Sequence, residues 1–450
     1  MNTAYQSLYA AHVAQVQSRW EAALNVEDLQ AVLVHSGAPM YSFLDDYEYA
    51  FRPNPHFLNW LPLTRHANSA LLVVAGQRPR LFYYQPDDYW YLPPADPESW
   101  WADHFDIEVV TDANGWLEGL ERVLAKAPFA AEKMAAIGDA PALKAKFPEP
   151  AHNPQGLVDR LHIARTRKTP YEVACIDRAA RLAAKAHVAA EQAFRAGESE
   201  YGIHMAYLAA CQHTDTQLPY NNIVALNDHG AVLHYQARER EAPDRRHSFL
   251  LDAGCTVHAY ASDITRTYAH SPGDFADLIA AMDEVQQGLT GKVRAGVDYK
   301  ELHLEAHRAI AGVLEAAGVI RVTADTAVES GLSAVFYPHG LGHFLGLQTH
   351  DVAGLIDNEC QPIARPEGHP ALRLTRVLEA GNVLTIEPGL YFIDSLLQRW
   401  REGRDAAMID WDRIAALAPC GGIRIEDNVV VTEDGCDNLT RRAFAGYFPE

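Results

Sequence analysis

The sequence contains few cysteines, and none of them lies in a C-x-x-C pair. There are six among 450 residues, and they are scattered along the chain. In a chain of this length, such spacing predicts free thiols in a reducing compartment and argues against a disulfide framework. The cysteines are Cys175, Cys211, Cys255, Cys360, Cys420 and Cys436. We therefore expect a cytoplasmic protein.

Basic residues and long apolar runs are also scarce. The 38 lysines and arginines are outnumbered by 59 aspartates and glutamates, which gives a formal charge of −21. This charge opposes phosphate backbones, so we expect no nucleic-acid partner, whereas surplus carboxylates favour cation binding. No apolar run approaches the roughly 20 residues of a membrane helix. The first 20 residues also lack the charged and apolar regions of a signal peptide, so we expect no membrane partner.

A chain of this length predicts two domains. Residues 1–160 have the pattern of a smaller mixed α/β domain, with an amphipathic helix near the N-terminus and three segments of β type. These segments are residues 29–37, 69–76 and 79–85. Segment 148–156 is rich in Pro, Asn and Gly, which makes it the best candidate for a linker.

The remaining residues, 161–450, alternate between helical and β-type sequence. Thr169, Pro170 and Glu172 form a capping-box pattern, which predicts a helix that ends before Gly197. A second helical region covers about 274–318. Short β-type segments follow each region, at 220–227, 231–235, 248–254, 264–270, 383–392 and 421–435. This order predicts an α+β domain with an internal duplication, in which helices cover an antiparallel sheet.

Four acidic residues lie at apolar β-type positions, namely Asp252, Asp263, Glu387 and Glu426. A purely structural interpretation is open for each of them. Asp252 and Asp263 would be turn or capping residues, and Glu426 would pair with Arg424 or face solvent. Clustered buried carboxylates, however, raise one another's pKa unless cations neutralise them. Two divalent ions held by carboxylates and one imidazole would satisfy the whole set, and manganese, cobalt and zinc all suit such donors.

The segment 335–352 holds three histidines, His339, His343 and His350. The first two have the four-residue spacing of a zinc-binding helix, but Gly340 and Gly342 do not fit a helix of that kind. Cys255, three residues after Asp252, is another potential soft ligand. Strand alternation places it on the opposite face from Asp252, so we interpret it as a core thiol.

Four stretches together, LDAGCTVHAYASDITRT, PHGLGHFLGLQTHDV, LTIEPGLYF and GGIRIED, resemble the metallopeptidases of the pita-bread fold. Within these, they are similar to the Xaa-Pro dipeptidases, or prolidases, including the bacterial organophosphorus acid anhydrolases. The resemblance covers about residues 165–440. It implies a pita-bread catalytic domain over residues 161–450, preceded by a smaller domain over residues 1–160.

The resemblance also implies roles for individual residues. Asp252 would bind one metal ion, Asp263 and Glu426 would bridge two, and His343 and Glu387 would bind the other. His339 would face the substrate instead of a metal, and His350 would contact the scissile carbonyl. Glu387 would also transfer the proton to the leaving nitrogen. The substrate-binding residues implied by the resemblance are His234, Tyr220, Arg373 and, less directly, Arg424.

The implied activity is hydrolysis of Xaa-Pro dipeptides by a metal-bridging hydroxide, with manganese as the first expectation. A homodimer and a side activity on organophosphorus esters are further expectations. One alternative is an aminopeptidase P, which acts on longer peptides with proline at the second position; another is a non-catalytic binding module on the same fold. Thr349 departs from the aliphatic residue that bacterial members often carry, which leaves the preferred N-terminal residue of the substrate open.

Overall fold

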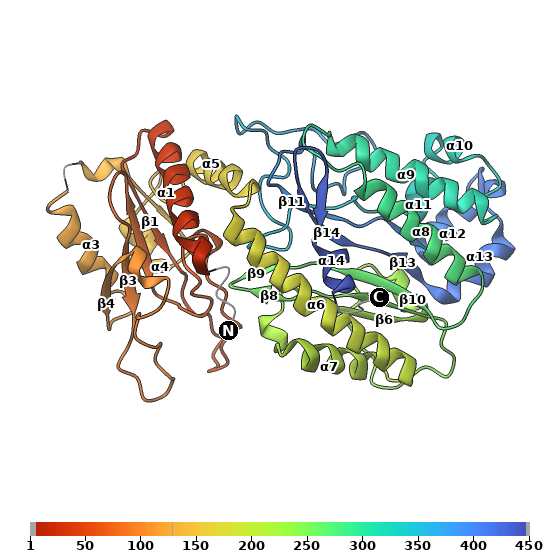
Figure 1. Ribbon diagram of the computed structural model, residues 1–450, viewed down its shortest axis with the longest axis horizontal. Coiled ribbons are helices and arrows are strands. Elements are labelled where there is room, and N and C mark those ends of the chain that lie inside the picture. The colour runs from red at the N-terminus through yellow and green to blue at the C-terminus, as the bar shows by residue number, and fades with distance from the viewer. Residues whose placement is uncertain (1–5, 128, 447–450) are drawn as a thin grey trace. The chain divides into compact units, whose positions relative to one another are not determined.

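The computed structural model of the chain describes residues 6–127 and 129–446 (Figure 1). The chain divides into two compact units, the first formed by residues 1–165 and 169–174 and the second by residues 166–168 and 175–450. The segment 148–156 lies inside the first unit, where it connects two helices, and not between the units. Within the described ranges, none of the helices combines the length and apolar character needed to cross a membrane.

The first unit contains a five-stranded mixed sheet in the order β4-β3-β2-β1-β5. Its strands are β1 (Ala31–His35), β2 (Ala70–Val74), β3 (Arg80–Tyr84), β4 (Asp106–Val110) and β5 (Met134–Ile137). Its helices are α1 (Tyr9–Val26), α2 (Pro55–Leu58), α3 (Trp116–Leu124), α4 (Pro141–Lys146) and α5 (Gln155–Thr166). All residues of β1 and β2 are buried, as expected of apolar strands covered on both faces. The predicted mixed α/β class is confirmed.

The second unit begins with two helices followed by a small antiparallel sheet. The helices are α6 (Pro170–Ala196) and α7 (Glu200–Cys211), and the sheet joins β6 (Ile223–Leu226), β7 (Ser248–Asp252) and β10 (Thr265–Ala269). Strands β8 (Thr256–Val257) and β9 (Tyr260–Ala261) form a hairpin. The predicted capping box is present: the Thr169 backbone N–H donates to Glu172 at 2.7 Å, and the Glu172 N–H donates to the Thr169 hydroxyl at 3.4 Å.

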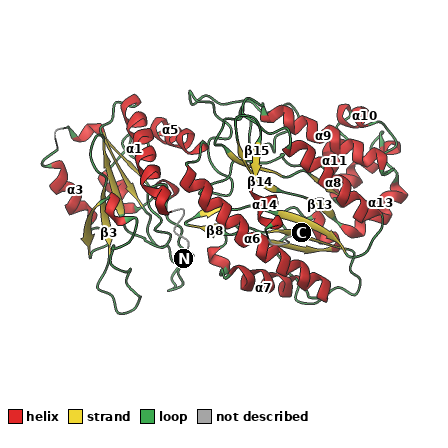
Figure 2. Ribbon diagram, viewed as in Figure 1, coloured by secondary structure: helices red, strands yellow, loops and turns green. Residues whose placement is uncertain are grey.

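The same order, helices and then antiparallel strands, occurs a second time. The helices are α8 (Asp274–Thr290), α9 (Tyr299–Ala316), α10 (Ala324–Glu329) and α11 (Ser333–Phe336). The strands are β11 (Val383–Ile386), β12 (Gly389–Tyr391), β13 (Gly422–Arg424), β14 (Asp427–Val431) and β15 (Cys436–Asn438), with α12 (Asp394–Arg401), α13 (Trp411–Leu417) and α14 (Leu439–Ala445) beside them. Figure 2 shows helices around these strands. The predicted α+β class is confirmed.

Two expected elements differ from the structure. The segment 231–235 is not a strand, because a 3-10 helix at Asn227–Ala231 follows β6 and a turn follows that helix. Asn227 has a φ of 57°, which redirects the chain at the end of β6. The helical region 274–318 is two helices, since the chain breaks at residues 291–298, where Gly296 has a φ of 85°.

The ends of the strands bring the four acidic residues together. Asp252 ends β7 and pairs with Thr265 on β10, so Asp263, two residues before Thr265, lies beside it on the same face. Glu426 lies between β13 and β14 and forms an isolated bridge with Thr265. Glu387 directly follows β11, whose last residue pairs with Asp427. Both helix-and-sheet repeats therefore contribute to one site.

Candidate metal centre

A cavity of about 410 Å³ in the second unit collects most of the residues singled out from the sequence. Its walls include all five expected metal ligands. They also include five residues expected on the substrate side, three histidines and two arginines. These lining residues are Asp252, Asp263, His343, Glu387, Glu426, His234, His339, His350, Arg373 and Arg424. Tyr220 is not part of the wall.

His343 lies at the centre of the carboxylate group. Its Nε2 atom is 3.4 Å from both Asp263 and Glu387, and one donor atom each from Asp263, His343 and Glu426 lies within 4.8 Å of the others. The Nδ1 atom lies 2.9 Å from the Phe344 carbonyl oxygen, to which it donates a hydrogen bond. That bond leaves Nε2 facing the carboxylates, the arrangement found in histidines that bind metals.

The carboxylates cannot all be ionised at neutral pH without a cation. Burial, together with Asp263, raises the pKa of Glu387 to about 7 and that of Glu426 well above its usual range. Burial lowers the pKa of His343, but its contacts with Asp263 and Glu387 outweigh this and raise it overall. In the metal-free protein, protons on these carboxyl groups therefore offset the negative charge that divalent ions would otherwise neutralise.

Two oxygen atoms of the group have no protein partner. Within the described ranges, Asp252 Oδ1 and Asp263 Oδ1 are buried and have no hydrogen-bond partner. A buried, unpartnered carboxylate oxygen is unfavourable unless a cation or a donor occupies the adjacent space. The donor set of four carboxylates and one imidazole thus fits divalent ions that prefer oxygen ligands.

Arg424 fixes Asp252 from behind the site. Its guanidinium donates to Asp252 at 2.6 Å, to the Tyr391 hydroxyl at 2.8 Å and to Thr265 at 3.1 Å. The Tyr391 hydroxyl in turn lies 2.8 Å from His339 Nε2, while His339 Nδ1 lies 2.8 Å from the Gly340 carbonyl. Both nitrogens of His339 are therefore engaged within the protein, which agrees with the expectation that it binds no metal.

The segment around His343 is not a helix, as its glycines indicated. Helix α11 ends at Phe336, and Gly342 has a φ of 157°. A Cβ atom at Gly342 would lie 2.2 Å from the Thr385 carbonyl oxygen, so only glycine fits this close approach to β11. The approach lets the Thr385 hydroxyl accept the backbone N–H of His343 at 3.1 Å. Gly342 thus allows the backbone of His343 to lie against β11.

Sequence reasoning missed two threonines that support the carboxylates. The Thr265 hydroxyl donates to Glu426 at 2.7 Å, and the Thr385 hydroxyl donates to Glu387 at 3.2 Å. Each threonine lies two residues along the chain from an acidic residue of the site, at a position that shares its face in extended sequence. That two-residue spacing was visible in the sequence and is the signal that could have identified them.

Replacing Thr385 with valine is expected to weaken metal binding by about tenfold, since loss of a group that orients a ligand typically costs 10- to 100-fold. Valine keeps the shape, but it removes the acceptor of the His343 N–H and the donor to Glu387. Metal titration of the chelator-stripped protein measures the effect. Thr375→Val is the matched control, because this buried hydroxyl contacts only carbonyl oxygens. Equal affinities of the two variants would contradict the prediction.

The expected substrate-side residues surround the metal group. His234, His350 and Arg373 are exposed at the cavity, and the His350 ring stands edge-on to His343 with ring centroids 4.4 Å apart. The cavity walls remove part of the water around the His350 ring, and this partial desolvation, together with the neighbouring His343, lowers the pKa of His350 to about 4. Burial and the nearby Asp252 raise the pKa of Tyr220 well above its usual range, which places its hydroxyl near the carboxylates.

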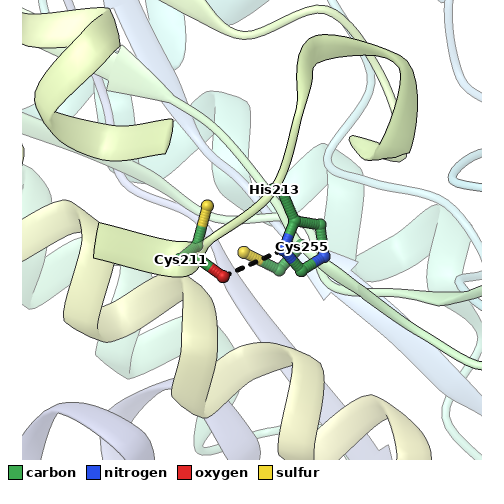
Figure 3. Close-up of side chains that lie close together, drawn as sticks. All are labelled: Cys211, His213 and Cys255. Atoms are coloured by element: carbon green, nitrogen blue, oxygen red, sulfur yellow. Dashed lines mark hydrogen bonds between the residues drawn. The ribbon is translucent and has the colours of Figure 1, made fainter. Parts of the chain in front are cut away.

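A second group of potential ligands, Cys211, His213 and Cys255, includes the last residue of α7 (Figure 3). Cys255 is fully buried, 3.6 Å from the Tyr207 hydroxyl, as expected of a core thiol. His213 Nδ1 is hydrogen-bonded to the Cys211 carbonyl oxygen, and Nε2 lies close to the backbone of Thr256. Both imidazole nitrogens have backbone partners, so we interpret this group as structural. All six cysteines are free, as predicted.

Comparison with known sequences gives a consistent result over nearly the whole chain. Residues 7–163 match the N-terminal domain of Xaa-Pro dipeptidase, and residues 174–433 match metallopeptidase family M24. An Xaa-Pro dipeptidase of Xanthomonas euvesicatoria is 49% identical over 442 residues, which is 98% of each chain. One of Stenotrophomonas maltophilia is 47% identical over 441 residues, again 98% of each chain.

Solved structures with a similar fold include two aminopeptidases. Aminopeptidase P from Escherichia coli is 24% identical, with a TM-score of 0.72 over 96% of this chain and 95% of that one. Proline aminopeptidase P II from Yersinia pestis is also 24% identical, with a TM-score of 0.71 over 96% of each chain. At this identity the likeness concerns the fold alone.

Proposed function

Because the chain belongs to metallopeptidase family M24 and is thus a metal-dependent peptidase, we propose that it hydrolyses Xaa-Pro dipeptides at a centre of two divalent ions. The observation that carries the proposal is the convergence of five donor side chains in one cavity of a chain related to Xaa-Pro dipeptidases along its full length. Asp252 would bind one ion, and His343 and Glu387 the other. Asp263 and Glu426 would lie between the two.

The chemistry is divided between the ions and the side chains around them. When bound, divalent ions supply an activated water and polarise the peptide carbonyl. Within the described chain, the Glu387 side chain has the Thr385 hydroxyl and His343 as polar partners. It would take the proton from the attacking water and deliver it to the leaving proline nitrogen. His350 would donate to the developing oxyanion, an interaction often worth ~3 kcal/mol. His339 would line the substrate side, held by Tyr391.

Substrate length would be set by Arg373. It is exposed at the cavity, where a guanidinium can hold the C-terminal carboxylate of a dipeptide through two hydrogen bonds. His234 would contribute to the same side, and Tyr220 to the pocket for proline. Arg424 is already bound to Asp252, Tyr391 and Thr265. These bonds support a role in orienting the proposed metal ligand Asp252, and not in contacting the substrate directly.

Replacing Arg373 with alanine is expected to abolish the preference for dipeptides over tripeptides, mainly through a higher KM for dipeptides. Loss of a charge-assisted carboxylate contact costs about 1.5 to 3 kcal/mol, or roughly 10- to 100-fold in kcat/KM. Steady-state kinetics on matched dipeptides and tripeptides measure the change. Arg365→Ala is the control, since Arg365 also lines the cavity but donates to the Leu372 carbonyl. An unchanged preference in Arg373→Ala would refute the role.

The proposed function is tested by proline release from Gly-Pro and Leu-Pro after chelation and reloading with single metals. We expect turnover with manganese above all, because oxygen donors with one imidazole suit it, with cobalt or zinc as alternatives. Preferential cleavage of longer peptides with proline second would favour an aminopeptidase P instead. No turnover with any of the three metals would leave only the binding-module alternative.

Three further properties belong to this proposal: a cytoplasmic location, a homodimer and a side activity on organophosphorus esters. The location is supported by the cysteines of the described chain, for which no disulfide is found. The dimer is supported by aromatic residues exposed in the first unit, such as Tyr89, Trp90 and Tyr91. Sedimentation at micromolar concentration tests the dimer, and phosphotriester hydrolysis under the same metal conditions tests the side activity.

A further inference from the structure

Three histidines form a compact group away from the carboxylates. His303 and His307 lie on α9, four residues apart and therefore on one face of the helix. His369 belongs to the loop between α11 and β11. His303 and His307 are each 1% exposed, and His369 is half-buried. The three ring centroids are 4.8, 4.7 and 4.5 Å apart, and one nitrogen of each ring lies within 4.8 Å of one from each of the others.

The nitrogen atoms of this group are only partly satisfied by the protein. His303 Nε2 lies 3.0 Å from His369 Nδ1, and His307 Nδ1 lies 3.1 Å from the Ser333 hydroxyl. Within the described part of the chain, His307 Nε2 and His303 Nδ1 are buried and have no hydrogen-bond partner. A buried polar atom without a partner costs about 1 to 3 kcal/mol, so two unpartnered imidazole nitrogens in a group of three close histidines point to a ligand.

The distances and charge states suit a metal ion. Zinc with Zn–N bonds of 2.0–2.1 Å and tetrahedral geometry separates its ligand nitrogens by about 3.4 Å, close to the 3.0 Å between His303 and His369. Burial, with the neighbouring histidines, lowers the pKa of His303 to about 2 and that of His307 to about 3. Burial also lowers the pKa of His369. All three rings are therefore neutral at neutral pH, the form that binds metals.

The group differs from the two other sets of potential ligands. At the carboxylate centre only one imidazole faces the donor oxygens, which suits harder ions. In the group of Cys211, His213 and Cys255, the only imidazole has backbone partners at both nitrogens. His307, by contrast, has the arrangement of a metal ligand: one nitrogen is oriented by a hydroxyl and the other is left open.

We propose that His303, His307 and His369 form a zinc site separate from the carboxylate centre, with a fourth position open to water. Zinc there ties α9 to the wall of the catalytic cavity, because Pro370 and Ala371, which follow His369, line that cavity. The Tyr337 ring packs against His307 and His339 with centroids 4.7 and 4.9 Å away, so it lies between the zinc site and the substrate side.

Metal stoichiometry and copper spectroscopy on the full chain test this proposal. After chelation, the wild type is expected to bind one more equivalent of Zn²⁺ than His369→Ala, which keeps only two of the three proposed ligands. His307→Phe, which keeps an aromatic ring in the core, is expected to behave like His369→Ala. His270→Ala, which removes an exposed histidine outside the group, is expected to match the wild type.

Cu²⁺ distinguishes this site from the carboxylate centre by the number of nitrogen ligands. Electron paramagnetic resonance of the copper-loaded wild type is expected to show coupling to three imidazoles, and His343→Ala is expected to keep that signal. The carboxylate centre alone offers a single imidazole from His343. Coupling to no more than one imidazole in the wild type, or an unchanged zinc count in both His369→Ala and His307→Phe, would overturn the proposal.

Discussion

Glu426→Gln is expected to abolish metal-dependent hydrolysis while leaving the metal-free fold as stable as the wild type. Glu426 is 2% exposed, and the Thr265 hydroxyl donates to it at 2.7 Å. Burial, with Asp263 and Glu387, holds the pKa of Glu426 well above its usual range, so the metal-free protein carries a neutral acid there. Glutamine has the same shape and charge as that acid, and its oxygen can accept the same hydrogen bond.

The expected loss of turnover in Glu426→Gln arises only in the metal-bound protein. In the proposed centre Glu426 lies between two ions, where a neutral amide cannot replace it, and the electrostatic stabilisation that such ions give a transition state is worth several kcal/mol. We therefore expect turnover to fall by on the order of 10³-fold or more. Metal content, thermal unfolding of the metal-free forms and turnover are compared with those of Glu402→Gln, an exposed control. A variant that retained its metal and turnover would contradict the role, as would one whose metal-free form unfolds more easily.

Glu426→Gln is also expected to change the number of protons released when metal binds. With the proposed ligands, binding of metal to the wild type requires Glu387 and Glu426 to lose protons, and the pKa of Glu387 is raised to about 7. The affinity for metal should therefore rise as pH rises through about 7 and fall below it. Calorimetry in buffers of different ionisation enthalpy counts the protons released. Glu426→Gln is expected to release one fewer proton per protein than the wild type.

The fold class and the acidic residues that meet at the cavity were predictable because their signals are local. Runs such as Phe249–Leu251 and Val383–Ile386 indicate buried strands, and an acidic residue directly after each run is conspicuous. The capping box at Thr169 likewise depends on neighbours in the chain. The strand expected at 231–235 was wrong because apolar composition alone does not reveal that Asn227 redirects the chain before it.

Contacts between distant segments were not predictable in this way. Arg424 shares the face of Glu426 in sequence, yet its partner is Asp252, 172 residues away. The pair His303 and His307 has a visible helical spacing, but the third member, His369, follows 62 residues after His307 and joins them only through the tertiary fold. Such partners depend on which strands and loops meet in the fold, and the sequence around each residue does not reveal these contacts.

The support of His350 is a further contact of this kind. Asp351, the next residue, forms an ion pair with Lys168 at 2.9 Å, and both side chains are only 1% exposed. The Asp351 backbone N–H also donates to the Phe344 carbonyl at 2.8 Å. A buried pair of this kind fixes geometry strongly, since removal of one partner leaves a buried charge uncompensated. The Lys168–Asp351 pair thus anchors the loop that presents His350 through side chains other than the expected metal ligands, while the Phe344 carbonyl is shared with His343.

This separation leads to the second large expected effect, a different outcome for two histidines whose rings touch. His350→Ala is expected to lower kcat by about 100-fold or more while metal content stays at the wild-type level, because loss of one oxyanion donor costs ~3 kcal/mol. His343→Ala is expected to lose metal, since its Nε2 is the only imidazole nitrogen within 3.4 Å of Asp263 and Glu387 in the described residues.

The two outcomes are separated by measuring metal content and turnover on the same samples. Added metal should restore part of the turnover of His343→Ala by mass action, whereas the turnover of His350→Ala should not respond to it. The two rings are oriented differently. The Nδ1–H of His343 is bound to the Phe344 carbonyl, and its other nitrogen faces the carboxylates. The His350 ring stands edge-on to the His343 ring, at the cavity. If both variants lost metal to the same extent, His350 would have to be assigned to the metal centre and not to the substrate.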